Sequence, residues 1–107
     1  MARVTVDPGV CGLRTEAVTE MEEDGMTCRL AVDSACPHVV KMAENLPTVN
    51  AFTEISHTGE GSAILRASIE HCPHPACPVP SALVKAVEVA SGLALPADVT
   101  IRFEEAE

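Results

Sequence analysis

The chain has 107 residues, the length of one ordinary globular domain, and its 47% apolar content is typical of a protein with a packed core. Its 16 acidic and 7 basic side chains give a formal net charge of −9, which disfavours binding to the phosphates of nucleic acid. No apolar run approaches the roughly 20 residues of a membrane span, and the first residues resemble a strand more than a signal peptide, so we expect a cytoplasmic protein that does not bind membranes.

Alternating apolar and polar side chains predict three short strands in the first third of the chain. These strands cover residues 3–7, 13–21 and 26–33. A turn at residues 7–9 follows the first strand. Glu23-Asp24-Gly25 predicts a hairpin between the second and third strands, because glycine supplies the positive φ that tight turns require.

After Cys36 the apolar spacing changes to that of a helix. Helices are expected over residues 36–46, 62–70 and 81–91, with a further helical turn within 50–56, and alternation over residues 99–103 predicts a final strand. This order predicts a single α+β domain spanning residues 1–107. Three N-terminal strands plus one C-terminal strand form a mainly antiparallel sheet, with helices packed on one face.

Cysteine is the residue type that points most directly to chemistry. Cys36, Cys72 and Cys77 are each followed by proline, which holds the preceding residue extended and is tolerated in the first turn of a helix. A thiol at a helix N-terminus lies where the helix dipole favours a thiolate. Cys28 differs, because it lies mid-strand among apolar neighbours and is expected to pack in the core.

The four cysteines outside regular structure are candidate metal ligands. Cys11 lies in a glycine-flanked turn, Cys36 precedes the first helix, and Cys72 and Cys77 bracket the loop before the last helix. If the helix N-termini gather at one sheet edge, these thiols can converge there. In a reducing compartment such a set favours an iron–sulfur cluster, for example [4Fe–4S], or Zn²⁺. Sulfur chemistry without a metal and purely structural thiols remain alternatives.

Histidines beside the cysteines could add to such a site. His71 and His74 lie within the cysteine loop and could be ligands or donate hydrogen bonds to cluster sulfur. Cys28 is a less favoured further candidate for the same roles. The alternative for both histidines is that they are exposed polar residues of the loop. Serine-nucleophile and phosphate-loop motifs are absent from the sequence. A role other than substrate conversion is therefore favoured.

Nearly the full length of the chain resembles a family of small, uncharacterised cysteine-rich proteins from anaerobic bacteria and archaea. The resemblance is carried by the segments Pro8-Gly-Val-Cys-Gly12, Asp33-Ser-Ala-Cys36, Cys77-Pro-Val-Pro-Ser-Ala-Leu-Val-Lys-Ala-Val-Glu88 and Gly92-Leu-Ala-Leu-Pro96. It implies no activity.

A second, partial resemblance is to iron–sulfur scaffold proteins of the IscU/NifU type. Cys11-Gly12 between two strands, Cys36 at a helix start and Cys77 before the last long helix are similar in place to the three scaffold cysteines. Leu13 follows where the scaffolds have an aspartate, the predicted final strand has no counterpart there, and Cys72 is an addition. The resemblance implies a cluster held by Cys11, Cys36, Cys72 and Cys77, more firmly than in a scaffold.

A third resemblance is local. Cys77-Pro-Val-Pro80 looks like the helix start of TusA-type sulfur-transfer proteins, which implies a persulfide on Cys77. Taken together, the sequence predicts a protein that binds an iron–sulfur cluster for storage, delivery or electron transfer, with structural zinc or sulfur carriage as the alternatives. The acidic surface favours a basic protein partner. A core with two Phe and no Tyr or Trp would gain from burial in a homo-oligomer.

Overall fold

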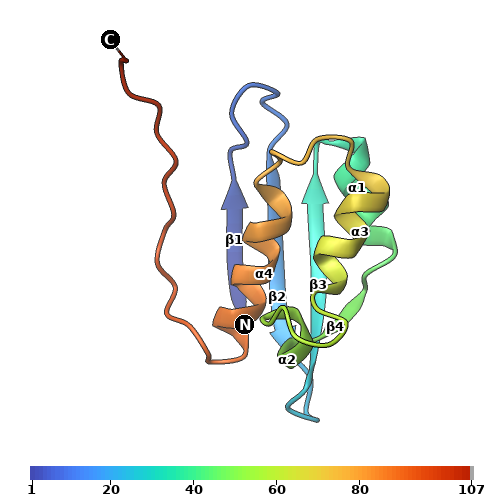
Figure 1. Cartoon of the computed structure of the whole chain (residues 1–107). Coiled ribbons are helices and arrows are strands. Elements are labelled where there is room, and N and C mark those ends of the chain that lie inside the picture. Colours follow the sequence, from blue (N-terminus) through green and yellow to red (C-terminus); the bar gives the residue numbers. More distant parts are fainter. Residues whose placement is uncertain (107) are drawn as a thin grey trace.

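The computed structural model describes residues 1–106. Four antiparallel strands form one sheet in the order β1-β2-β3-β4 (Figure 1). The strands are β1 (Ala2–Val6), β2 (Thr15–Met21), β3 (Thr27–Ser34) and β4 (Thr48–Asn50). Val4 lies opposite Ala17, which lies opposite Val32, so these three residues and every second residue along each strand share one face. The α+β class and the three N-terminal strands are confirmed.

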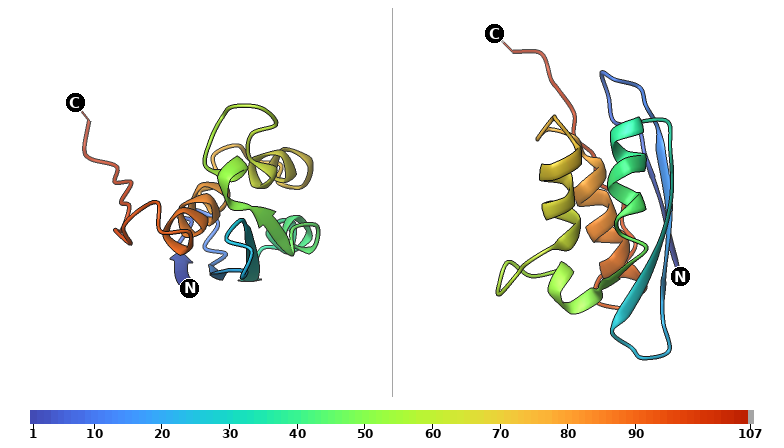
Figure 2. Two further views of the ribbon diagram at one scale, coloured as in Figure 1. Left: turned by 90° about the horizontal axis from the view of Figure 1, so that it is seen from below. Right: turned by 90° about the vertical axis from the view of Figure 1, so that its right-hand side faces the viewer.

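Four helices cover one face of this sheet. They are α1 (Pro37–Glu44), α2 (Ala51–Glu54), α3 (Ala63–His71) and α4 (Val79–Ala90). The longest, α4, packs on β1 and β2, while α1 packs on β3. In the right-hand view of Figure 2, α3 lies outside these two helices, against α1 and α4. The opposite face of the sheet carries both charged and small uncharged side chains, among them Glu20, Arg29 and Ala31.

The core lies between the sheet and the inner helices. Its fully buried members include Met42 of α1, Leu83 and Val87 of α4, and Cys28 of β3. One buried polar side chain also joins the layers, because the hydroxyl of Thr19 donates to the carbonyl oxygen of Ala86 at 2.8 Å. That bond fixes α4 on β2 and satisfies a hydroxyl that would otherwise be costly to bury.

The predicted C-terminal strand over residues 99–103 is wrong. Residues 91–106 contain neither helix nor strand, and the fourth strand is β4, in the middle of the chain. β4 forms because Pro47 ends the preceding helical segment and Val49 enters the core opposite Cys28. Three residues are too few to show alternation in a sequence.

The start of the last helix also differs from expectation. The helix α4 begins at Val79 instead of Ser81, because Pro80 falls in the first turn, where a helix needs no backbone donor. The predicted helical turn within residues 50–56 is confirmed as α2, whose N-cap Asn50 accepts from the backbone N–H groups of Phe52 and Thr53. Within residues 1–106, no helix is long and apolar enough to cross a membrane.

Asp24 closes the hairpin between β2 and β3. Its Oδ1 accepts from the backbone N–H groups of Met26 at 2.9 Å and Thr27 at 2.8 Å, and its Oδ2 accepts from the Thr27 hydroxyl at 2.6 Å. The Thr27 hydroxyl, followed by the two backbone donors, lowers the pKa of the exposed Asp24 carboxyl.

We therefore expect Thr27→Val to raise the pKa of Asp24 toward its usual value of about 4, since the strongest stabilising contact is removed. A depressed folded-state pKa contributes stability above the unfolded pKa, and that stability is lost as the pH falls through the folded pKa. The stability difference between wild type and Asp24→Ala should be greatest above about pH 5 and shrink on further acidification. NMR titration and denaturation at several pH values measure both effects; an unchanged Asp24 pKa in Thr27→Val would contradict the first.

Candidate metal centre

Three segments that carry cysteines meet at one end of the sheet. β1 and β3 run toward this end and β2 runs away from it, so the loop of residues 7–14 and the junction of β3 with α1 both lie there. The loop of residues 72–78, between α3 and α4, lies at the same end, at the top of Figure 1. We call this the cysteine end; it brings together the segments of Cys11, Cys36, Cys72 and Cys77.

Cys36 is the N-cap residue of α1. Its extended backbone, with φ −88° and ψ 119°, follows from the proline after it, and its carbonyl oxygen accepts the first helical bond from Val40. The backbone N–H of Cys36 donates to Ser34 Oγ at 3.1 Å. Its thiol forms no capping hydrogen bond with the described residues and is half-buried against the core. The sulfur is therefore positioned at a helix N-terminus, where it does not act as a capping acceptor.

Cys72 and Cys77 lie at the two ends of the proline-rich loop. Cys72 ends α3, where its backbone N–H donates to the Ser68 carbonyl at 2.8 Å, and its Sγ lies 4.0 Å from Sδ of Met42. The backbone N–H of Cys77 donates to the His74 carbonyl at 3.2 Å, which closes a turn just before α4. Both side chains are half-buried and pack against the core.

The pKa of the Cys72 thiol responds to burial and to two other thiols. Burial raises the pKa of the Cys72 thiol, and negative charge on Cys77 and on Cys36 raises it further. Such repulsion between thiolates would be relieved by a bound cation, because a metal ion favours deprotonation of its ligands. Cys36, Cys72 and Cys77 all pack against the core at the cysteine end, and we call these three residues the thiol cluster.

Cys11 is separate from the thiol cluster. It is exposed in the loop of residues 7–14, where the backbone N–H of Gly12 donates to the Gly9 carbonyl at 3.0 Å and both glycines have positive φ. Within residues 1–106, no three His, Cys, Asp or Glu side chains lie close enough together to hold a metal ion. The donor type fits a soft metal or a cluster, but closing the site requires the thiols to approach one another.

The other candidate ligands point elsewhere. His71 Nε2 lies 3.3 Å from Asn45 Nδ2 and 3.7 Å from Glu70 Oε2, so its ring is directed toward the end of α1. His74 is exposed in the loop. Cys28 is fully buried, as its place in the strand predicts, and lies opposite Met21 and Val49, about 20 Å of extended strand from the cysteine end. Burial raises the pKa of its thiol, which favours the neutral form.

A buried carboxylate that the sequence did not reveal fixes the start of α3. Glu54 is only 2% exposed and accepts from the Ser62 hydroxyl at 2.6 Å, from the Ala63 backbone N–H at 2.6 Å and from the Ile64 backbone N–H at 3.3 Å. It caps a helix from a different element, so no local sequence signal announces it. Glu54 thereby fixes the start of the helix that ends at Cys72.

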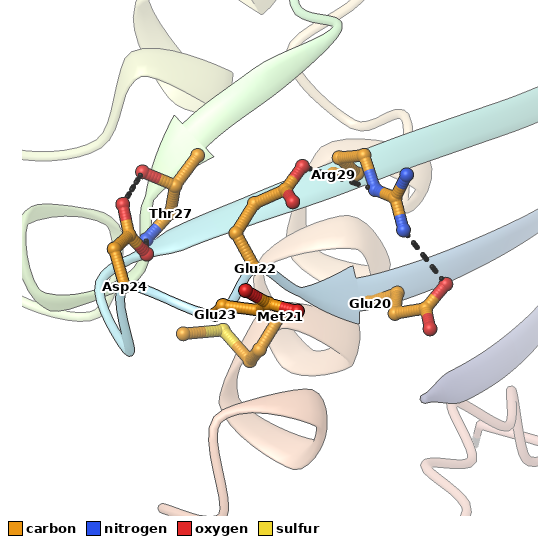
Figure 3. A pocket seen from close by; sticks show the side chains of 7 residues that line it. All are labelled: Glu20, Met21, Glu22, Glu23, Asp24, Thr27 and Arg29. Carbon is orange, nitrogen blue, oxygen red and sulfur yellow. Dashed lines mark hydrogen bonds and ion pairs between the residues drawn. The ribbon is translucent and has the colours of Figure 1, made fainter.

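An open hollow of about 620 Å³ lies at the hairpin, at the opposite end of β2 and β3 from the cysteines. Arg29 forms ion pairs with Glu20 at 3.0 Å and with Glu22 at 3.1 Å. Figure 3 shows Arg29 between these two carboxylates and Asp24 turned to Thr27. Each of these charges is solvated and already paired. The hollow is thus the surface of a hairpin and offers no convergent donors to a ligand.

Comparison with curated proteins and with solved structures gave no match. The resemblance to iron–sulfur scaffolds therefore stays a hypothesis, to be judged on the thiols themselves. A family model does match residues 2–103, and the chain accordingly belongs to a family of unknown function, DUF6951.

Proposed function

We propose that the protein binds an iron–sulfur cluster through Cys36, Cys72 and Cys77, with Cys11 as the fourth ligand. The observation that carries the proposal is the thiol cluster at the cysteine end: Cys72 and Cys77 belong to the loop between α3 and α4, Cys36 belongs to the junction of β3 with α1, and all three are half-buried. Two of them, Cys36 and Cys77, stand directly at helix starts. Thiolates are the usual ligands of iron–sulfur clusters, and helix N-termini stabilise their charge.

The order of elements also supports this proposal. Without the final strand, the chain departs less from the layout of IscU/NifU-type scaffolds, which also have three strands followed by helices, although the short β4 is extra. Cys11 would complete the ligand set by movement of the loop of residues 7–14, for which Gly9 and Gly12 provide backbone freedom. Cys72 would turn its sulfur from Met42 toward Cys77.

The test is anaerobic purification, followed by iron and sulfide analysis and visible spectroscopy. Wild type should be brown, with stoichiometric iron and sulfide. Cys36→Ser, Cys72→Ser and Cys77→Ser should each lose most of both, since each removes a thiolate ligand. Cys28→Ala is the matched control, because it also removes a cysteine but lies outside the thiol cluster, and it should retain the cluster.

Two other results of this test would give the thiols a different role or contradict the proposal. A colourless protein with stoichiometric zinc that unfolds on chelation would replace the cluster by a structural zinc ion. Iron retained in all three Ser variants would contradict the proposal.

Sulfur carriage by Cys77 is the second candidate function. The observation that favours it is the position of Cys77 immediately before Pro78, the N-cap of the 12-residue helix α4. Unpaired N–H groups at such a helix start favour an anionic persulfide. Mass spectrometry of metal-free protein would then show one added sulfur, lost in Cys77→Ser and retained in Cys36→Ser. The absence of that added mass would contradict this candidate.

A further inference from the structure

The C-terminal segment, residues 91–106, carries exposed apolar side chains away from the domain. Figure 1 and the left-hand view of Figure 2 both show it standing clear of the sheet and helices. Its large apolar residues and their exposed fractions are Leu93 51%, Leu95 87%, Val99 61%, Ile101 78% and Phe103 97%. The family match extends to residue 103, so this segment is part of the family's shared domain. Such a density of exposed apolar side chains indicates a contact surface.

The sequence of this segment is that of a strand. Val99, Ile101 and Phe103 alternate with Thr100, Arg102 and Glu104, so an extended backbone would place the apolar three on one face. Within residues 1–106 this segment pairs with no other strand. The segment therefore has the alternation of a strand but no pairing partner among the described residues.

A matching edge exists on the same protein. In the part of the chain that the structure describes, β1 has a neighbour on one side only, so its outer side presents unpaired backbone donors and acceptors. Val4 and Val6 point to the helix-covered face, and Arg3 and Thr5 point to the other. A strand added here would extend the apolar layer beside Val4 and Val6.

Charge selects a register for this pairing. If Phe103 lies opposite Val4 in an antiparallel pair, Ile101 lies opposite Val6 and Glu104 lies opposite Arg3. Arg3 forms no ion pair within the described residues, so it is free to meet Glu104. Opposite charges at directly paired positions stabilise antiparallel strands.

We propose that residues 99–104 pair with β1 of a second copy of this chain. Each chain offers one unpaired strand and one open edge, so a reciprocal exchange satisfies both and closes with two-fold symmetry. The result is a dimer in which each sheet gains a fifth strand. The proposal is independent of any metal or persulfide on the cysteines.

The test is sedimentation equilibrium of the full chain under reducing conditions, which exclude disulfide-linked dimers. We expect a dimer. Removal of residues 99–107 should give a monomer, as should Ile101→Lys, which places a charge in the apolar layer. Removal of residues 105–107 is the control, because it leaves the pairing strand whole, and it should leave the dimer intact.

A charge exchange tests the register. Arg3→Glu should raise the dimer dissociation constant by roughly tenfold, because two ion pairs become repulsive, and Arg3→Glu with Glu104→Arg should restore it. A monomeric full chain overturns the proposal. If hydrogen exchange of such a monomer shows protected amides in residues 99–103, the segment pairs within its own chain, and the proposal is overturned as well. A dimer that survives removal of residues 99–107 overturns it as well, and failure of the double variant to recover overturns the register.

Discussion

Glu54→Ala is expected to lower the free energy of unfolding by about 3 kcal/mol. The carboxylate is buried and accepts three hydrogen bonds, from Ser62 Oγ and from the backbone N–H groups of Ala63 and Ile64. Alanine would leave the two backbone donors at the start of α3 without this partner. Hydrogen bonds to a charged group are stronger than neutral ones, and the unsatisfied donors add a desolvation cost.

Urea denaturation followed by circular dichroism measures this loss. Glu60→Ala is the matched control, because Glu60 is an exposed carboxylate in the same connection between α2 and α3, and we expect a change within about 0.5 kcal/mol for it. Glu54→Gln should fall between the two, since its amide keeps one acceptor oxygen. Equal stability of Glu54→Ala and Glu60→Ala would show that the buried carboxylate does not cap α3 in solution.

Leu83→Ala is expected to cost about 3 kcal/mol of unfolding free energy. Leu83 is fully buried at the centre of α4, the helix that packs on both β1 and β2. Truncation removes apolar contact and leaves a cavity between layers that share few large side chains. For a domain of this size such a loss is a substantial part of the total stability of about 5–15 kcal/mol.

The control for this variant is Lys85→Ala on the exposed side of the same helix, which keeps helix propensity and removes no core contact. We expect its free energy of unfolding to lie within about 0.5 kcal/mol of the wild-type value. The dependence of stability on urea should have the same slope in all three proteins, so that midpoints compare directly. A cost below about 1 kcal/mol for Leu83→Ala would contradict the packing of α4 on the sheet.

Local sequence patterns correctly predicted the strands and turns that depend mainly on their own residues. The three N-terminal strands, the hairpin at Asp24 and the burial of Cys28 follow from alternation and turn chemistry, and the structure contains all of them. The final strand failed for a physical reason: Val99, Ile101 and Phe103 have the alternation of a strand, but a strand also needs a neighbour, and sequence alone does not supply one. β4 was missed because its three residues are held by pairing with β3.

The candidate site was predictable in part. Proline after Cys36 and Cys77 indicated helix starts, and α1 and α4 begin there, at the same end of the sheet. That the cysteines share one metal stays a prediction. The exposed position of Cys11 depends on the path of a loop, which composition does not determine. Glu54 was not predictable, because its partners lie in another helix.

The packing of α4 on β1 has a consequence for biosynthesis. The first strand contacts the last helix, so the domain cannot complete its core until residue 90 has emerged from the ribosome. Cys36 is translated well before Cys77, and their segments meet at the cysteine end when α4 packs on the sheet. Any ligand that needs both sulfurs can therefore bind only once Cys77 has been translated, and its binding can accompany the docking of α4.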